Sequence, residues 1–550
     1  MRQRILRIHP LDNVIVALDQ LNAGEEVQLN DETYQLKQAI PPKHKFAQVD
    51  FQPGDTIKMY GVRVGKAALP IQRGEAITTQ NIHHDAETYG LREQQYQWQP
   101  PKVDQWKEAT FMGYHRSDGK VGVANYWLVI PLVFCENRNL QVMREALVKE
   151  LGYDRSQSHH FNVRSLVQQY QQGTSADALL QAPIILSAEE SDQQRTFPHV
   201  DGIQFLTHEG GCGGTRQDAQ TLCALFAGYI THANVAGATV LSLGCQNAED
   251  QILLDEIRKR DPNFDKPLHI LEQQQSASER DFIAEAIKKT FVGLAQANQI
   301  ERKPAPLSKL VVGLECGGSD GFSGISANPS VGHAADLLVA LGGSVVLSEF
   351  PELCGVEQEL TDRCADRETA EKFIRLMRAY SRSAEAVGSG FDMNPSPGNI
   401  KDGLITDAIK SAGAAKKGGT SPVTDVLDYP EPVTKPGLNL LCTPGNDVES
   451  TTGLAGAGAT IILFTTGLGT PTGNAVAPTL KISSNTTLAK RMNDIIDIDA
   501  GTIISGDDTI ETKGEEILDF IIRTANGSYA PKAVRLGQDD FIPWKRGVSL

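Results

Sequence analysis

Cysteine is scarce in this chain, which has 8 in 550 residues. So few thiols exclude a disulfide-stapled scaffold and favour reduced cysteines in the cytoplasm. Long apolar runs are missing as well, because stretches such as ATIILF at 459–464 are far too short to span a bilayer. The opening MRQRILRIHPLDN also lacks the apolar core of a secretory signal. We therefore expect a cytoplasmic protein with no membrane partner.

Basic residues are in deficit, since 52 Lys and Arg stand against 68 Asp and Glu, a net charge of −16. No run of Lys and Arg forms a patch for nucleic acid, and an acidic surface repels phosphate backbones. A small anionic ligand stays compatible with this balance, because a local site can be positive in a negative protein. The 50 glycines gather in loops, where they let the backbone approach a small molecule closely.

The length predicts two or three domains. Residues 1–90 alternate short apolar runs with turn residues, a pattern typical of a small β-rich domain. A polar, aromatic stretch at 91–107 predicts a linker. From 108 onward apolar strands alternate with helical patterns, which predicts α/β domains with largely parallel sheets over 108–300 and 301–550.

Ligands of open α/β sheets bind at the carboxyl ends of the strands. Cys212, Cys245 and Cys316 stand at such positions, each in a turn of small residues after an apolar run. If they converge, three thiolates suit an iron–sulfur cluster with one open iron, or a mononuclear site completed by histidine. Three buried thiols are the alternative, because no CxxC spacing is present. Four further cysteines are interpreted as packing residues: Cys135, Cys354, Cys364 and Cys442.

The loop THEGGCGGTRQD at 207–218 leads into a predicted helix. Free N–H groups at a helix N-terminus attract anions, so a substrate carboxylate fits there with Arg216 beside it. His208 is a candidate for proton transfer. A tight strand-to-helix turn, with Cys212 packed beneath it, is the alternative interpretation.

Other loops carry polar side chains suited to a hydroxylated ligand. GGSDGFSG at 317–324 offers Ser319 and Asp320, and PGND at 444–447 offers Asn446 and Asp447. Glu349 follows another predicted strand and is the second candidate for proton transfer.

Several long segments resemble blocks of the altronate/galactarate dehydratase family, in that family's order. HPLDNVIVAL and PPKHKFAQVDFQPGDTIKMYGVRVGKA resemble its N-terminal SAF-type domain. Six later segments of this chain resemble further blocks of the family: THEGGCGG, LSLGCQN, GLECGGSDGFSGISANP, SEFPELCGVEQ, NPSPGN and LFTTGLGTPTGN. The resemblance covers nearly the whole chain, and the altronate branch is the nearer one.

The resemblance implies a hydro-lyase that dehydrates D-altronate to 2-dehydro-3-deoxy-D-gluconate in hexuronate catabolism. A base removes the C2 proton, the C3 hydroxyl leaves, and the developing enediolate needs electrostatic stabilisation. The resemblance implies iron(II), Fe(2+), as cofactor, which fits the loop cysteines. Another divalent metal such as Mn(2+), or an iron–sulfur cluster, is the alternative, and Cys212, Cys245 and Cys316 are the candidate ligands.

The same resemblance makes His44 a candidate substrate contact, because it matches the family's HK position. One block departs from the family: where its SAF domain has His-x-His-Asn, this chain has Thr78-Thr79-Gln80-Asn81.

Two alternatives stay open. Galactarate or another sugar acid is the alternative substrate, because the loops set which C6 group is accepted. A non-catalytic sugar-acid binding protein is the alternative from another class. The loss of both SAF histidines keeps it open, and the intact cysteine and GGSDG loops argue against it. A small-molecule sugar acid is the expected partner, and a homodimer is the expected assembly.

Overall fold

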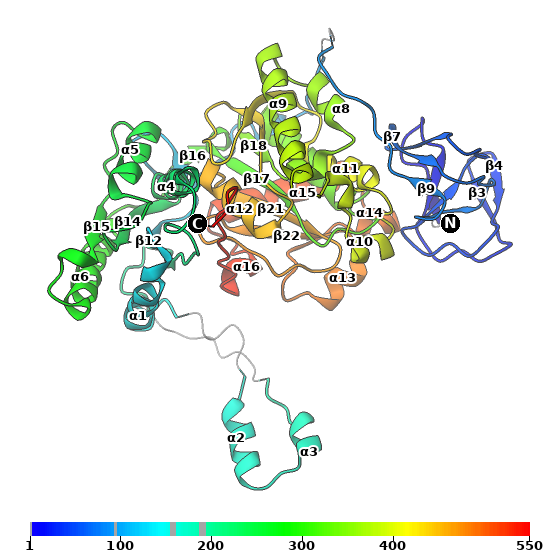
Figure 1. Ribbon diagram of the computed structural model, residues 1–550. Coiled ribbons are helices and arrows are strands. Elements are labelled where there is room, and N and C mark those ends of the chain that lie inside the picture. Colours follow the sequence, from blue (N-terminus) through cyan, green and yellow to red (C-terminus); the bar gives the residue numbers. More distant parts are fainter. Residues whose placement is uncertain (1–2, 93–95, 155–160, 186–193, 550) are drawn as a thin grey trace.

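The computed structural model describes residues 3–92, 96–154, 161–185 and 194–549. Its three parts are arranged in a row (Figure 1): the N-terminal β-rich domain lies at one end, the middle α/β domain at the other, and the C-terminal α/β domain between them. The fold class expected from the sequence is confirmed in its layout, because a small β-rich domain precedes α/β domains with parallel sheets.

The N-terminal domain consists of short antiparallel strands in the orders β1-β2-β5-β8, β3-β4 and β6-β7-β9. Gly24, Gly54 and Gly74 take positive φ in the turns between strands, where a side chain would be strained. The strands are β1 (Ile5–Leu6), β2 (Val14–Ala17), β3 (Glu26–Leu29), β4 (Glu32–Gln35), β5 (Lys45–Ala47), β6 (Thr56–Met59), β7 (Val62–Ala67), β8 (Ala76–Ile77) and β9 (Ile82–His83).

The middle domain has a four-stranded parallel sheet of order β13-β12-β14-β15. All eight residues of β14 are buried, as expected for a strand covered by helices on both faces. Its elements are β12 (Tyr126–Pro131), β13 (Gly202–Phe205), β14 (Val235–Ser242), β15 (Leu268–Glu272), α1 (Asn137–Leu147), α2 (Val163–Gln171), α3 (Ala176–Leu180), α4 (Arg216–Ile230), α5 (Asp250–Arg260) and α6 (Glu279–Ala297).

The C-terminal domain has a seven-stranded parallel sheet of order β19-β20-β18-β17-β21-β22-β23. Its strands are β17 (Val311–Cys316), β18 (Ser344–Leu347), β19 (Val423–Leu427), β20 (Gly437–Leu441), β21 (Ile461–Thr466), β22 (Thr479–Ser483) and β23 (Ile498–Asp499). Its helices are α7 (Ala327–Ala340), α8 (Glu357–Asp362), α9 (Arg367–Glu385), α10 (Pro397–Lys401), α11 (Asp407–Ala414), α12 (Asp447–Ala457), α13 (Thr486–Arg491), α14 (Thr502–Ser505), α15 (Ile510–Ala525) and α16 (Lys532–Arg535), with 3-10 turns η5 (Phe350–Leu353) and η7 (Ala415–Gly418).

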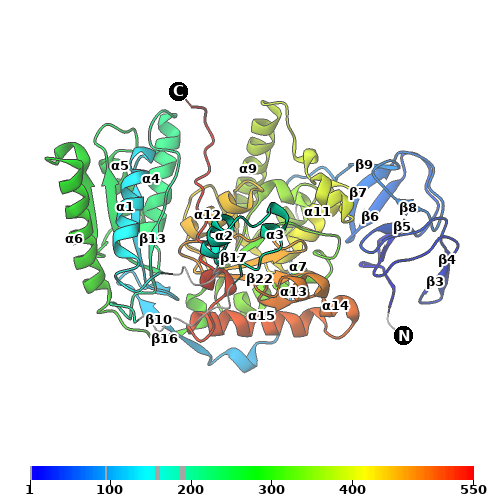
Figure 2. The ribbon, with the colours of Figure 1, turned by 90° about the horizontal axis from the view of Figure 1, so that it is seen from below.

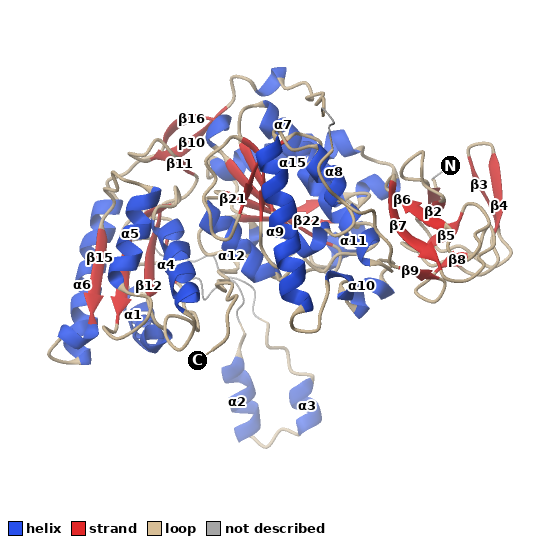
Figure 3. Cartoon of the chain, turned by 45° about the horizontal axis from the view of Figure 1, so that its top comes forward, coloured by secondary structure: helices blue, strands red, loops and turns tan. Residues whose placement is uncertain are grey.

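The two α/β domains share one hydrophobic core. Leu454 of α12 belongs to the same buried cluster as Leu225 of α4 and Val240 of β14. A small sheet also joins the domains, because β10 (Thr110–His115) pairs with β11 (Val121–Gly122) and with β16 (Lys303–Pro306), as Figure 3 shows.

The last residues of the chain reinforce the contact between the α/β domains. The segment runs between α4 and the C-terminal domain (Figure 2). Phe541 stacks on Phe226 of α4 with ring centroids 5.9 Å apart, and the Arg546 and Gly547 backbone N–H groups donate to Asp218 Oδ1 at 3.1 and 3.0 Å.

Part of the expected linker at 91–107 is docked. Tyr96 Oη donates to the Thr420 carbonyl at 2.6 Å, and Trp98 Nε1 donates to Thr420 Oγ1 at 3.1 Å. Residues 93–95 lie outside the described residues. Within the described ranges, no helix is both long and apolar enough to cross a membrane.

The run Lys43–Lys45 holds the N-terminal domain on the C-terminal domain. Lys45 Nζ donates to the Gly403 carbonyl at 2.6 Å, and the side chain is only 1% exposed. Burial lowers the pKa of Lys45 to about 7, although the charge of Asp320 opposes this shift.

Replacing Lys45 with Met is expected to flatten the pH dependence of stability. From about pH 7 to pH 9 the unfolded chain binds a proton that the folded Lys45 releases, so wild-type stability rises with pH by up to about 1.4 kcal/mol per unit. The measurement is the thermal midpoint at both pH values for wild type, Lys45→Met and the exposed control Lys37→Met. If the thermal midpoint of Lys45→Met still rose from pH 7 to pH 9 as in wild type, Lys45 would not be the group that causes the pH dependence.

Candidate active site

The C-terminal sheet ends in a buried cluster of ionisable side chains. Cys316 is the last residue of β17, and Glu349 and Glu352 follow the adjacent strand β18, so the parallel strands bring all three to one edge. One ligand atom from each lies within 4.8 Å of the others. None of the three is more than 3% exposed.

Lys417 is the cation at the centre of this cluster. Its Nζ, carried by η7, donates to Cys316 Sγ at 2.6 Å and to Glu349 Oε2 at 2.7 Å. The side chain is 1% exposed. An ammonium group buried this deeply is stable only when anions surround it, so the lysine and the acids depend on one another.

A second lysine compensates Glu352. Lys410 of α11 donates to Glu352 Oε1 at 2.6 Å and to Asn394 Oδ1 at 3.0 Å. Glu352 Oε2 in turn lies 3.3 Å from Cys316 Sγ. The two lysines, the thiol and both glutamates therefore form one continuous network.

Glu349 is held in a strained backbone conformation. Its φ of 66° and ψ of 58° fall in the left-handed region, which is uncommon for residues other than glycine. Its backbone N–H donates to Thr443 Oγ1 at 2.8 Å, and this bond helps to hold the conformation. Strain of this kind concentrates at functional sites.

Two buried carboxylate oxygens in the cluster have no hydrogen-bond partner among the described residues: Glu315 Oε1 and Glu349 Oε1. The other Glu315 oxygen accepts from Ser450 Oγ at 2.6 Å and Ser348 Oγ at 3.0 Å. Unsatisfied buried oxygens are costly, so the cluster has spare acceptor capacity for a proton, a water or a ligand.

Burial raises the pKa of the carboxyls of Glu349 and Glu315 and that of the Cys316 thiol. Burial alone lowers the pKa of Lys417, but Cys316, Glu349 and the other nearby acids raise it well above its ordinary value. The geometry therefore keeps Lys417 charged.

Asp447 lies at the rim of the cluster, at the first position of α12. Burial raises the pKa of its carboxyl to about 7, and the charges of Glu349 and Glu352 add to the shift. Its Oδ2 packs against Gly317, where a Cβ atom would be only 2.0 Å away. A half-buried carboxyl that titrates near neutral pH suits acid–base catalysis.

A resident metal ion does not fit the Cys316 cluster as it stands. One thiol and two carboxylates are suitable donors for iron(II). However, the Lys417 ammonium already lies 2.6 Å from the thiol sulfur and 2.7 Å from Glu349 Oε2, so a second cation would be repelled.

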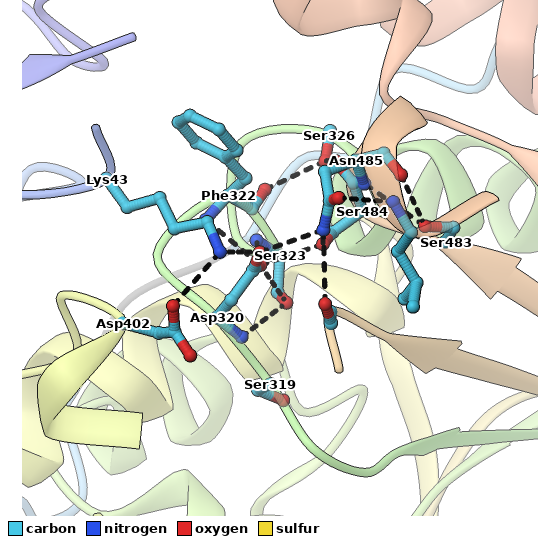
Figure 4. A network of polar contacts seen from close by, with 12 residues as sticks. Lys43, Ser319, Asp320, Phe322, Ser323, Ser326, Asp402, Ser483, Ser484 and Asn485 are labelled. Atoms are coloured by element: carbon cyan, nitrogen blue, oxygen red, sulfur yellow. Dashed lines mark hydrogen bonds and ion pairs between the residues drawn. The ribbon is translucent and has the colours of Figure 1, made fainter. Parts of the chain in front are cut away.

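Asp320 anchors the N-terminal domain (Figure 4). Its Oδ1 accepts from Ser323 Oγ at 3.0 Å and Ser484 Oγ at 2.8 Å, and its Oδ2 accepts from Asn485 Nδ2 at 3.2 Å. Lys43 Nζ lies 2.9 Å from Oδ2 and 3.2 Å from Asp402 Oδ1. Both oxygens are engaged, so the contacts of Asp320 give it a structural role at this junction; its contact with substrate hydroxyls stays a prediction.

His44 and Ser319 lie at the same junction of domains. His44 Nε2 contacts the Lys401 carbonyl at 3.1 Å, and the Ser319 carbonyl accepts from Asn399 Nδ2 at 2.7 Å. Both contacts are made to the short helix α10, so they position this helix.

His208 is not free to act as a base. Its Nδ1 accepts from the Gly210 N–H at 2.9 Å, which requires the proton to sit on Nε2, and Nε2 donates to the Pro131 carbonyl at 2.8 Å. Burial lowers the pKa of His208 to about 4. Both ring nitrogens of His208 are engaged in this way, and the imidazole ties the loop after β13 to the end of β12. These contacts favour a structural role over the predicted proton transfer.

Cys212 and Cys245 lie in a different domain from Cys316. The first two are exposed at the edge of the middle-domain sheet, whereas Cys316 is buried at the edge of the C-terminal sheet. The trio is not among the groups of described residues whose ligand atoms lie within 4.8 Å of one another. Cys135, expected to be a packing residue, is exposed as well. Arg216 begins α4 and its side chain is exposed.

Asn446 and Asp447 take different roles although they are neighbours. Asn446 is the N-cap of α12, and its Oδ1 accepts from the Val448 N–H at 3.2 Å and the Glu449 N–H at 3.3 Å. Only Asp447 faces the ionisable cluster.

Several residues of the cluster were missed by sequence reasoning: Glu315, Glu352, Lys410 and Lys417. The three-residue spacing of Glu349 and Glu352 in SEFPEL was the available signal. Nothing in the sequence indicated that two lysines from η7 and α11 reach the same edge, because they are far from it along the chain.

A second group with metal-ligand chemistry lies where the N-terminal domain meets the C-terminal domain. Ligand atoms of His84, Cys354 and Asp407 lie within 4.8 Å of one another. His84 directly follows β9, a few residues after the position where the family's SAF histidines are absent.

A SAF domain followed by two parallel α/β domains is the domain set of one class of proteins, the altronate/galactarate dehydratases. Models of this class match the chain as "Altronate/galactarate dehydratase SAF domain" at 3–85, "D-galactarate dehydratase/Altronate hydrolase, second domain" at 113–298, and "D-galactarate/Altronate dehydratase, C-terminal" at 307–549. The chain therefore belongs to the altronate/galactarate dehydratase family.

Curated relatives agree with this assignment. The chain is 34% identical to an altronate dehydratase of Escherichia coli strain K12 over 526 residues, which cover 95% of each protein. It is 33% identical to an altronate dehydratase of Bacillus subtilis strain 168 over 99% of both. A galactarate dehydratase (L-threo-forming) of Escherichia coli is 29% identical, over 95% of this chain and 92% of the relative.

Replacing Lys417 with Met is expected to lower stability by about 3–5 kcal/mol, because it leaves a buried thiol and carboxylate uncompensated. The neighbouring control Lys416→Met, whose side chain is 35% exposed, should change it little. Urea unfolding of both variants is the measurement. Adding Glu349→Gln to Lys417→Met should restore part of the lost stability. An equal loss of unfolding free energy in Lys417→Met and Lys416→Met would refute the charge argument.

Proposed function

We propose that this protein is a hydro-lyase that dehydrates a sugar acid, with D-altronate as substrate and 2-dehydro-3-deoxy-D-gluconate as product. The observation that carries the proposal is the buried network of Cys316, Glu349, Glu352 and two charged lysines at the carboxyl edge of the C-terminal sheet. Family membership supplies the reaction class. The greater identity to the two altronate dehydratases than to the galactarate dehydratase favours altronate.

The network suits the difficult step of this reaction. Removing the C2 proton of a carboxylate builds negative charge on the carboxylate oxygens, and fixed positive groups in a water-excluded site stabilise that charge. Lys410 and Lys417 are such groups. Lys410, with 9% of its side chain exposed, is the one nearer to solvent and to an entering substrate.

Asp447 is our candidate for the proton-transfer residue. It is less buried than Glu349, and its pKa of about 7 leaves a large fraction ionised at neutral pH. Glu349 keeps Lys417 in place through the 2.7 Å ion pair. In this proposal Asp447 takes the C2 proton, and Glu349 positions the ammonium that stabilises the enediolate.

The decisive experiment is anaerobic turnover of D-altronate and of galactarate by the purified protein, with iron(II) present and the 2-keto-3-deoxy product measured. We expect product from altronate at a kcat/KM at least tenfold above that for galactarate. A preference for galactarate would overturn the substrate assignment. Tight binding of either acid without turnover would favour a binding protein instead.

Asp447→Asn is expected to lower kcat/KM by about 10²–10⁴, the usual contribution of a general base. In wild type, activity should rise with pH through about 7 as Asp447 loses its proton, and this inflection should vanish in the variant. Glu449→Gln is the matched control, because Glu449 lies on the same turn and its charge acts on Tyr429 and Tyr380. An unchanged inflection in Asp447→Asn would assign the proton transfer to another group.

A further inference from the structure

Three exposed cysteines lie at one edge of the middle-domain sheet. Cys135 follows β12, Cys212 follows β13 and Cys245 follows β14, and these parallel strands are adjacent in the order β13-β12-β14. All eight cysteines are among the described residues, and only these three are exposed. Cysteine is one of the most frequently buried residues, so three exposed thiols at one edge call for an explanation.

The loops that carry Cys135 and Cys212 are locked together. The Phe134 N–H donates to the Gly210 carbonyl at 3.1 Å. Asn137 Nδ2 donates to the His208 carbonyl at 2.8 Å, and Asn137 Oδ1 accepts from the His208 N–H at 3.4 Å. The His208 imidazole adds its bond to Pro131, so four contacts fix one loop against the other.

The loop of Cys245 is tied to the same turn. The Gly211 carbonyl accepts from the Asn247 N–H at 2.9 Å and the Ala248 N–H at 3.1 Å. Gln246 closes the cysteine turn itself, because its Oε1 accepts from the Gly244 N–H at 2.8 Å and its Nε2 donates to Ser242 Oγ at 2.7 Å. The three thiols therefore stand on a preorganised framework.

Gly211 shows how closely the loops approach. Its φ is +96°, and a Cβ atom at this position would lie 2.0 Å from the Leu132 carbonyl oxygen. Only glycine lets the Cys212 loop lie directly on the end of β12, beside the Cys135 loop.

The spacing of the thiols excludes a single ion in this arrangement. Two thiolates at about 2.3 Å from one metal ion are at most about 4.6 Å apart. Cys135, Cys212 and Cys245 are not a group with all ligand atoms within 4.8 Å of one another, so at least one pair is farther apart. A multi-iron cluster spreads its thiolates over different irons and accepts the wider spacing.

We propose that Cys135, Cys212 and Cys245 bind a four-iron, four-sulfur cluster through three of its irons. The fourth iron has no thiolate from this set and is open to an oxygen ligand of hydroxy-acid chemistry. A cavity of about 560 Å³ borders Cys212 and is lined by Asn137, Thr215 and Lys545, which suit an anionic, hydroxylated ligand. The choice of a hydroxy-acid ligand rests on the proposed function. The cluster itself is inferred from the arrangement of the three cysteine loops.

Cys316 is thereby separated from iron binding. It belongs to the lysine-compensated cluster of the other α/β domain, and Cys135 takes the third ligand position that the sequence assigned to Cys316. When bound, the cluster supplies a Lewis acid for a hydroxyl or carboxylate oxygen. The residues around the cysteines keep the ligands in position. His208 and Asn137 fix the loops of Cys135 and Cys212, and Gln246 fixes the loop of Cys245.

The test is the iron and acid-labile sulfide content of the full-length protein, purified without oxygen from iron-replete cells, together with its visible absorption. We expect about four irons and about four sulfides per chain. Cys135→Ser, Cys212→Ser and Cys245→Ser should each lose most of both, and their thermal midpoints should equal that of the wild type stripped of its cluster, because the three side chains are exposed in the cluster-free chain. Cys364→Ser and Cys316→Ser should retain them.

The outcomes separate this inference from the proposed function. About one iron without sulfide, or full cluster content in all three serine variants, would overturn the cluster. A cluster lost only in those variants, with no turnover of either sugar acid by the wild type, would support the cluster and refute the dehydratase proposal. Turnover of a sugar acid by protein that contains neither iron nor sulfide would support the dehydratase proposal and refute the cluster.

Discussion

The C-terminal site depends on the compensation of buried charge by Lys417. A thiol, several carboxyls and an ammonium group are packed where water cannot screen them, and each is stable only because the others are present. The contacts of 2.6 Å to Cys316 and 2.7 Å to Glu349 require β17, β18 and η7 to meet at one point. The parallel sheet provides this meeting point, since the carboxyl ends of adjacent strands share an edge.

The same principle of paired charge joins the domains. Lys43 reaches from the N-terminal domain to Asp320 and Asp402, while Lys45 enters the interface with only a carbonyl to bind, and its pKa is lowered as a result. The loop that follows Cys316 thus serves two purposes. Its first residues border the ionisable cluster, and its Asp320 anchors the SAF domain.

The two α/β domains present two chemically different edges. The C-terminal edge offers charged lysines and carboxyls suited to proton transfer, and the middle-domain edge offers exposed thiols suited to iron. Helix α12 and the final segment of the chain lie between α4 and the C-terminal sheet and share a core with both.

The sequence by itself determined the domain order, the parallel α/β class and the positions of the strands that end in polar, ionisable residues. Apolar runs followed by glycine-rich turns are local signals, so β12, β14, β17 and β18 could be predicted from them. It also pointed correctly to Glu349 and Asp447 as polar residues beyond strand ends. Only the tertiary structure decided which of these residues meet. It buried Cys316 in one domain and left Cys212 and Cys245 exposed in another, brought Lys410 and Lys417 to the Cys316 cluster, and used both nitrogens of His208 for backbone contacts. Such outcomes depend on strand order and on the packing of segments remote in sequence, and the period and composition of a local segment carry no information about either.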